Sequence, residues 1–238
     1  MTNCEKTKDS RNILLSRSCA TIRVMKIFCI IIFILSAGIH LYASYKQDKP
    51  LRNATKPFIL PALIGLYCFS TKTVQATVIL ALVFSWIGDL LLIPKGVKWF
   101  TAGGISFMVS HFFFVLSYLK GIDFTRIHPL VILFFAAAFV IAVTVIFTHL
   151  RPHLPKALFY PMYLYLLING TMNCFAIFRC FTSPGLSGII TMIGAALFFI
   201  SDASLFFVRF KKDSRMKTHF WVMLTYSLGE LLIVLGLI

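Results

Sequence analysis

The feature that most constrains this chain is a series of apolar stretches, each close to the length that a helix needs to cross a bilayer. We place them at about 24–45, 57–71, 74–93, 99–119, 128–148, 157–179, 186–208 and 218–238. A helix needs about 20 predominantly apolar residues to span the hydrocarbon core. Only helices and closed barrels satisfy their backbone hydrogen bonds in lipid. The pattern predicts an all-α polytopic integral membrane protein with about eight transmembrane helices.

The composition supports this class and argues against a nucleic-acid-binding protein. Only 13% of the 238 residues are charged, whereas a soluble domain carries about 25%. The net charge of +15 comes from Lys and Arg in the short connections between apolar stretches, where membrane proteins place positive charge. The six cysteines show no CxxC and no zinc-ligand spacing, so we interpret them as inert packing residues.

No connection is long enough for a separate soluble domain, so we expect one membrane domain over residues 24–238. Residues 1–23 are basic and polar, and we interpret them as a flexible N-terminal extension. The apolar stretch after them exceeds the 7–15 apolar residues of a signal peptide, which predicts a retained first helix. Met25 is an alternative start of the chain.

The distribution of basic residues predicts the orientation. Counted from the first, the odd connections hold Lys46, Lys49, Arg52, Lys56, Lys95, Lys98, Arg151, Lys156, Arg209, Lys211, Lys212, Arg215 and Lys217. The even connections hold only Lys72, Lys120, Arg126 and Arg179. The positive-inside rule therefore places the odd connections in the cytoplasm, although the basic N-terminus favours the opposite. If the source is bacterial, we expect the inner membrane.

Four ionisable side chains lie within the apolar stretches: Asp89 in the third, His111 in the fourth, Asp202 in the seventh and Glu230 in the eighth. A charged Asp at the bilayer centre costs about 2.5–3.5 kcal/mol on insertion scales, so such residues usually face the interior of the bundle and serve function. From the helical rise, Asp89 lies about 6 Å and Asp202 about 10 Å before the end of its stretch.

The third and seventh helices both run towards an odd connection, so Asp89 and Asp202 approach from the same face of the membrane. Two carboxyls beneath Lys and Arg side chains suggest a ligand with a phosphate outside and an apolar body inside. "FSWIGD" and "FFISD" put an Asp late in the third helix of each four-helix half. This weak repeat suggests two halves, between which membrane proteins often place their sites.

Other polar residues share helix faces with these acids. Gly104, Phe107 and His111 lie at i, i+3 and i+7, and Tyr226 and Glu230 at i, i+4. Asn169 and Asn173 share a face too, which hydrogen bonding between helices explains equally well. GxSxG, HExxH, P-loop and GxGxxG motifs do not occur in the sequence. A metal site, and a transporter or proton relay that uses the same acids, stay open as alternatives.

Five short motifs occur in order along the chain: "KPFILP" (56–61), "FSWIGDLLL" (84–92), "GISFMVSHFFF" (104–114), "GAALFFISD" (194–202) and "YSLGELLI" (226–233). They resemble the YhhN family of lysoplasmalogenases, which includes transmembrane protein 86-like members, from about residue 26 to the end. Two positions depart from the family pattern. Phe114 stands where a tyrosine is frequent, and Glu230 stands where glutamine is usual.

The resemblance implies a lysoplasmalogenase-like ether hydrolase that acts on lysophospholipids in the bilayer. Such an enzyme cleaves the vinyl ether of a lysoplasmalogen to a fatty aldehyde and a glycerophospho-ethanolamine or -choline. Acid protonates the β carbon, and water attacks the resulting oxocarbenium ion. Two close carboxyls at low dielectric disfavour double ionisation, so one keeps its proton and the other stabilises the cation. Glycosidases use two carboxyls in an analogous way.

On this hypothesis Asp89 and Asp202 are the catalytic pair, with either one as the proton donor. The supporting or substrate-binding candidates are His111, Lys56, Glu230, Tyr226, Tyr165, Asn173 and Ser201. His111 is expected to orient water or a carboxyl, and Lys56 to contact the phosphate. We expect no cofactor, no metal and no nucleic-acid partner. A transporter, a metal hydrolase and an intramembrane aspartyl protease are the competing interpretations.

Overall fold

The computed structural model describes the backbone of residues 4–183, 185–211 and 219–238, and the side chains of those residues from 21 onward. The eight α-helices over these residues are α1 (Cys4–Lys46), α2 (Lys49–Ser70), α3 (Ala76–Leu91), α4 (Val97–Leu119), α5 (Pro129–Leu150), α6 (Phe159–Thr182), α7 (Leu186–Phe210) and α8 (Phe220–Leu237). Three short 3₁₀ helices lie in the connections: η1 (Phe124–Arg126), η2 (Arg151–His153) and η3 (Lys156–Leu158). The described residues contain no strand, which confirms the all-α prediction.

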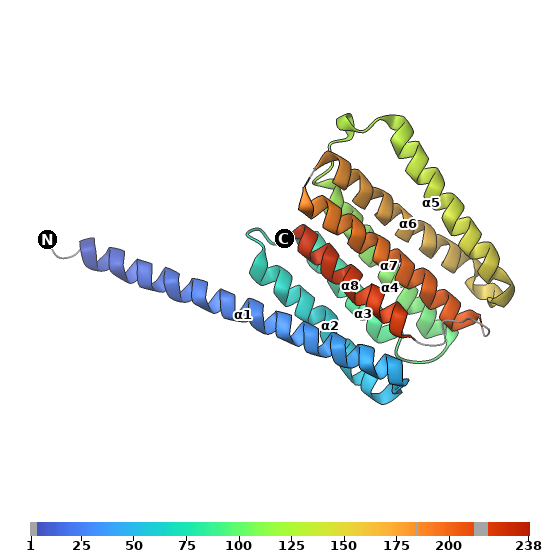
Figure 1. Ribbon diagram of the computed structural model, residues 1–238, viewed down its shortest axis with the longest axis horizontal. Helices are drawn as coiled ribbons and strands as arrows, with labels where there is room; N and C mark the ends of the chain where they lie inside the picture. The colour runs from blue at the N-terminus through green and yellow to red at the C-terminus, as the bar shows by residue number, and fades with distance from the viewer. Residues whose placement is uncertain (1–3, 184, 212–218) are drawn as a thin grey trace.

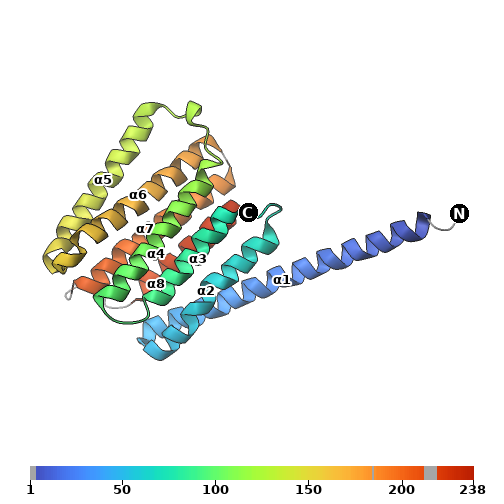
Figure 2. The ribbon, with the colours of Figure 1, turned by 180° about the vertical axis from the view of Figure 1, so that it is seen from behind.

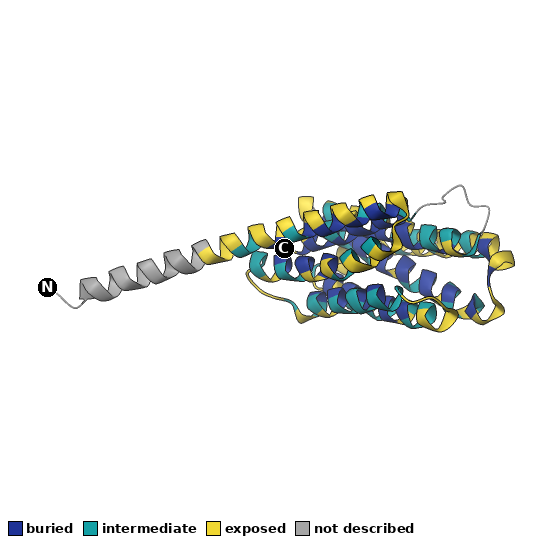
Figure 3. Ribbon diagram, turned by 90° about the horizontal axis from the view of Figure 1, so that it is seen from below, coloured by how far each residue is buried: buried dark blue, intermediate teal, exposed yellow. Residues whose placement is uncertain are grey.

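The helices form two layers. One layer holds α1, α8, α7, α6 and α5 in that order, and the other holds α2, α3 and α4 behind it (Figures 1 and 2). The layers are joined where α1 packs on α2 and where α4 packs on α6. Buried residues concentrate between the layers, as the edge-on view in Figure 3 shows. The middle of this interface, between α3–α4 and α7–α8, is where the acidic side chains lie.

The chain is a multi-pass membrane protein. Within the described residues, six helices are long and apolar enough to cross a membrane, namely α1 from Thr21, α4, α5 with its following turn, α6 with its preceding turn, α7 and α8. The helices α2 and α3 fall short of that criterion but pack beside the others. α3 has 16 residues, fewer than the stretch predicted at 74–93. The cytoplasmic orientation and the division into two halves stay predictions, and Lys212, Arg215 and Lys217 lie outside the described residues.

The helix α2 begins at Lys49, within the polar segment that separates the first two apolar stretches. The Asp48 side chain caps it by accepting a hydrogen bond from the Leu51 backbone N–H at 3.1 Å, and Pro50 fits the first helical turn. Because Pro61 lacks an N–H, the Pro57 carbonyl has no helical donor. The Trp86 indole of α3 donates to that carbonyl at 2.9 Å, which ties α2 to α3.

Glycines bring α7 and α8 into close contact. A Cβ on Gly229 would lie 2.9 Å from the Gly194 carbonyl oxygen, and one on Gly194 would lie 2.7 Å from the Ile233 backbone nitrogen. Small residues permit such close packing of membrane helices. The contact fixes Asp202 of α7 relative to Tyr226 of α8.

The first helix is longer than the sequence pattern predicts, because it begins at Cys4 and its N-terminal part projects from the bundle (Figure 1). Its second half packs on α2 and α8 and buries Phe33, Ala37, His40 and Ala43. The separation of a flexible extension (1–23) from a membrane domain (24–238) stays a prediction.

Candidate active site

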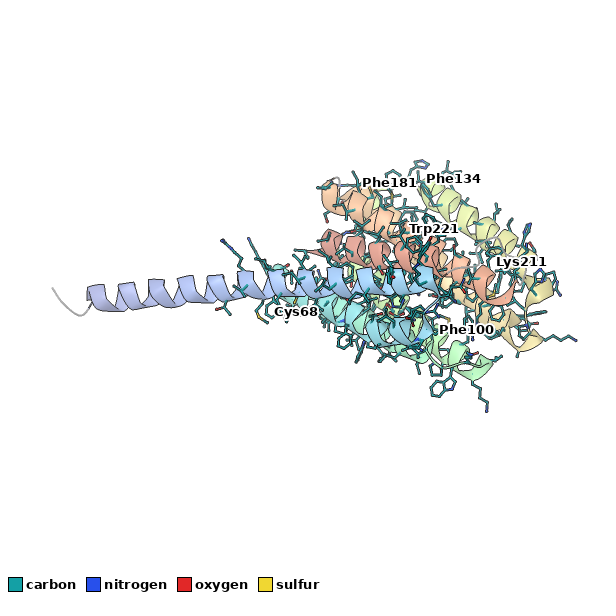
Figure 4. The ribbon with its side chains drawn as sticks, turned by 60° about the horizontal axis from the view of Figure 1, so that its bottom comes forward. Cys68, Phe100, Phe134, Phe181, Lys211 and Trp221 are labelled. Atoms are coloured by element: carbon teal, nitrogen blue, oxygen red, sulfur yellow. The ribbon has the colours of Figure 1, made fainter. Side chains whose placement is uncertain are left out.

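A cavity of about 310 Å³ lies between the two layers. It opens at the end of the bundle where the odd connections meet, since the exposed side chains of Lys49, Lys95 and Arg209 line that end. Figure 4 shows Phe100 and Lys211 near this end of the bundle and Cys68 near the opposite end. Both Asp89 and Asp202 line the cavity, so the predicted approach from one membrane face is confirmed.

Asp89 is held by a cation and a phenol. The Lys56 ammonium of α2 lies 3.0 Å from Oδ1, and the Tyr226 hydroxyl of α8 donates to Oδ2 at 2.8 Å. The Asp89 residue is 2% exposed. Lys56 is adjacent in sequence to Pro57, whose carbonyl accepts the Trp86 hydrogen bond, so the α2–α3 contact also positions the ammonium. Asp89 is thus one half of a buried ion pair.

Asp202 has a different set of partners. The Tyr165 hydroxyl donates to its Oδ2, as does the Asn169 amide at 2.7 Å. The Nε2 atom of His111 lies 3.8 Å from the same oxygen. No Lys or Arg among the described side chains lies within ion-pair distance of Asp202. The Oδ1 atom accepts none of these hydrogen bonds.

A further residue orients the Asn169 amide. The Asn173 amide donates to Asn169 Oδ1 at 3.1 Å and to the Asn169 carbonyl at 3.0 Å. With its amide oxygen used in this way, Asn169 directs its nitrogen at Asp202. Asn173, a predicted substrate-binding residue, therefore lies behind the site and not on the cavity wall.

Aromatic rings separate the cavity from the deeper interior. Phe198 contacts both His111 and Tyr226, with ring centroids 5.0 and 5.4 Å apart. Phe107 packs on Phe198 and Tyr226 at 6.2 Å from each. Gly88 accommodates the Phe107 ring, because a Cβ there would lie 2.7 Å from it. These rings keep water away from the inner sides of both carboxyls.

The two carboxyls share the cavity without touching. The described contacts include no hydrogen bond between Asp89 and Asp202, and each has its own donors. The geometry is that of two acids facing a common space, with unequal partners.

The remaining candidates fall into two groups. Lys56, Tyr165, Tyr226 and Ser201 line the cavity, although the Ser201 hydroxyl donates to the Val222 carbonyl at 2.8 Å and so joins α7 to α8. His111 and Glu230 are fully buried outside it. The Glu230 carboxyl has no hydrogen-bond partner in the described structure. The nearby Ser85 hydroxyl pairs with the Ser110 hydroxyl at 2.8 Å.

Sequence reasoning did not select several residues that the fold brings to the site. The basic side chains that line the open end are Lys49, Arg52, Lys95, Arg209 and His219, here named the basic rim. Hydrogen bonding between helices explains Asn169 in the sequence as well as a role in the site does. The one sequence feature that indicates Asn169 as a site residue is that it shares a helix face with Asn173. The sequence predicts basic residues above the two carboxyls, but it does not indicate which of them form the rim, because the members come from separate connections.

Charges at the basic rim act on His219, which precedes α8. Burial and the positive charges of Arg52, Lys56 and Arg209 lower the pKa of His219 from 6.5 to about 4. Its imidazole is therefore neutral near pH 7. Over the described residues, no group of three or more His, Cys, Asp or Glu is arranged to hold a metal ion.

Comparison with known protein families shows to which family the chain belongs. A family model described as the YhhN family matches residues 51–237, from α2 to the end of α8. This chain belongs to the YhhN family. The match confirms the resemblance seen in the motifs, and it begins at residue 51, later than the expected start near residue 26. Searches of the curated proteins and of the solved structures found no match.

Proposed function

We propose that this YhhN-family protein is a membrane-embedded hydrolase that cleaves the vinyl ether of lysoplasmalogens. The products are a fatty aldehyde and a glycerophospho-ethanolamine or -choline. One observation carries the proposal: two buried carboxyls face one cavity, and only one of them has a cationic partner. Hydrolysis of a vinyl ether requires this asymmetry, because it uses an acid that holds a proton and a carboxylate beside the developing cation.

The different partners of the two carboxyls support different roles for them. The ammonium of Lys56 compensates a negative charge on Asp89, so Asp89 is the carboxylate. Asp202 is buried with neutral donors, and a buried carboxylate without a cation is costly, so Asp202 is the protonated acid. Tyr165 and Asn169 both donate to Oδ2, which acts as the carbonyl oxygen of the acid. The proton then lies on Oδ1.

The first half of the reaction forms a hemiacetal. Asp202 transfers its proton to the β carbon of the vinyl ether, the C=C bond becomes a C–C single bond, and the α carbon becomes an oxocarbenium ion. The Asp89 carboxylate stabilises this cation and takes a proton from the water that attacks the α carbon. At this point Asp89 holds a proton and Asp202 has lost one.

The second half restores both carboxyls. Asp89 gives its proton to the glyceryl oxygen while Asp202 takes the proton of the hemiacetal hydroxyl. The C–O bond to glycerol breaks, and the aldehyde forms. The balance is one vinyl ether and one water consumed, with one aldehyde and one alcohol released.

The cavity suits a single-chain lipid. Its wall includes apolar side chains, among them Leu92, Ile105, Met108, Met162, Leu205 and Phe206. Apolar walls with a few convergent polar groups are typical of ligand pockets. The hydrocarbon chain is expected to lie against these residues, with the ether between the two carboxyls.

Isotope labelling of the purified protein tests the reaction. In D₂O, the aldehyde should carry one deuterium on the carbon next to the carbonyl, because the acid proton exchanges with solvent. In H₂¹⁸O, the label should enter the aldehyde, which is trapped at once by reduction, and should be absent from the glycerophospho product. An ¹⁸O label on the glycerol carbon would contradict the mechanism. Solute or proton uptake by proteoliposomes without aldehyde release would favour a transporter instead.

A further inference from the structure

Three members of the basic rim converge on the open end of the cavity from different parts of the chain. Arg52 comes from the first turn of α2, Arg209 from the last turn of α7, and His219 precedes α8. All three line the same cavity as the two carboxyls. The fold therefore assembles a cationic site that is dispersed in the sequence.

No carboxylate neutralises this site within the described residues. Among the described residues, the only acids on the cavity wall are Asp89 and Asp202, both at its depth, and Asp89 is already paired with Lys56. Neither Arg52 nor Arg209 has an acidic partner within 4.0 Å there. The guanidinium of Arg209 lies 5.7 Å from the centroid of the Phe100 ring, which holds it at the cavity edge.

The positive charges at this site repel each other, so a bound anion would stabilise it. Arg52 and Arg209 are close enough to His219 to disfavour its protonation, which is one cause of its lowered pKa. An anion placed among these groups removes the repulsion and gains charge-assisted hydrogen bonds from two guanidinium groups.

We propose that Arg52, Arg209 and His219 form a phosphate site that holds the headgroup phosphate of the lipid substrate. This rests on the proposed function, because the phosphate then fixes how deep the vinyl ether enters the cavity. Among the described residues, the site contains no acid to contact an amine, so we expect the phosphate to be recognised and the ethanolamine or choline to extend to solvent. A vinyl ether lipid without phosphate is therefore a poor substrate.

A kinetic comparison of two substrates tests the site. The two are a lysoplasmenylethanolamine and a 1-alkenylglycerol that lacks the phosphate, both in an uncharged detergent. The wild type should prefer the phospholipid. In the R52A/R209A double variant, the kcat/KM for the phospholipid divided by that for the 1-alkenylglycerol should fall at least tenfold, because the KM for the phospholipid rises. The R52K variant, which keeps a positive charge at position 52, should keep part of the wild-type ratio. Lys98→Ala, an exposed basic residue on α4 outside the cavity, is the control and should leave the ratio unchanged.

A binding measurement separates this proposal from the reaction. Lysophosphatidate, which has no vinyl ether, should raise the thermal unfolding temperature of the full-length protein but not that of R52A/R209A. Inorganic phosphate at the same concentration should have a smaller effect, and an equal effect would overturn the assignment to a lipid headgroup. If aldehyde is released but neither the ratio nor the shift changes in R52A/R209A, the phosphate site is wrong and the function stands. If no vinyl ether lipid is cleaved but the shift still requires both arginines, the function is wrong and the phosphate site stands.

Discussion

At the scale of single residues, the site depends on a difference between two chemically identical side chains. Asp89 has a lysine 3.0 Å away, and Asp202 has a tyrosine, an amide and a histidine. Sequence position alone makes the two acids equivalent, because each lies late in an apolar helix. These different neighbours support the proposed roles of Asp89 as the carboxylate and Asp202 as the acid.

Replacing either aspartate should abolish most activity, with different effects on stability. D202N removes the proton donor and should lower kcat by about 10³-fold, a typical loss for a general acid. It should leave thermal unfolding near the wild-type value, because an amide oxygen still accepts the Tyr165 and Asn169 hydrogen bonds. D89N should lower both kcat and stability, because Lys56 stays buried without its partner.

Aldehyde release and thermal unfolding in the same detergent check both variants. In D89N/K56M the unpaired ammonium is absent, so stability should recover while activity stays low. Full activity in D202N would exclude Asp202 as the acid.

Glu230 should tolerate replacement by glutamine. Its carboxyl is buried without a cation or a hydrogen-bond partner, and glutamine has the same shape without an ionisable group. We expect E230Q to unfold at the same temperature as the wild type or a higher one, and to release aldehyde at a rate within threefold. A loss of more than tenfold would instead give the carboxyl a part in the reaction.

At the scale of helices, the site depends on a few close contacts that set the register between neighbours. Trp86 of α3 donates a hydrogen bond to the Pro57 carbonyl of α2, which has no helical donor because residue 61 is proline. Paired glycines allow α8 to pack closely on α7. These contacts place Lys56 beside Asp89 and Tyr226 within reach of the same carboxyl. A helix shift of about 1.5 Å, the rise of one residue, would break both.

Gly229→Ala should separate α7 from α8. The added Cβ would lie 2.9 Å from a backbone oxygen, and backbone cannot move as a flexible side chain does, so we expect about 1–3 kcal/mol of destabilisation. The rate of aldehyde release should fall together with the stability, because Tyr226 moves away from Asp89. Gly38→Ala in α1 is the matched control, because nothing lies within 4 Å of its Cβ position. Equal unfolding temperatures for the two variants would contradict the close-packing argument.

At the scale of the whole molecule, the family match covers less of the chain than the helix bundle does. The family match starts in α2, whereas α1 adds a helix whose second half packs on α2 and α8. Residues 21–24 are exposed, and the first strongly buried side chain of the described part of α1 is Cys29. The bundle therefore needs α1 from about residue 25.

A chain that starts at Met25 should fold and function as the full-length protein does. The deletion leaves the buried face of α1 intact, and it removes basic residues that oppose the predicted orientation. Aldehyde release and unfolding temperature should match those of the full chain within experimental error. A drop in either would show that residues 1–24 contribute to the membrane domain.

The fold class, most helix positions and the two intramembrane aspartates could be predicted from the amino-acid sequence. Long apolar stretches must become helices in lipid, because no other open structure satisfies the backbone there. Charged residues within such stretches are costly enough that Asp89 and Asp202 stand out without any coordinates. The helix direction also predicted correctly that both acids approach from one face. The polar start of α2 was missed, because its capping by Asp48 and Pro50 resembles a loop signal.

Only the tertiary structure decided which side chains meet. The lysine of "KPFILP" reaches Asp89, and the phenol of Tyr165 reaches Asp202. Arg52, Arg209 and His219 come together at one opening. These contacts join residues far apart in the chain, on helices whose faces the apolar pattern does not distinguish, since lipid-facing and core-facing positions are both hydrophobic. Packing between helices, set by glycines and by single hydrogen bonds, is what gives two similar aspartates different partners.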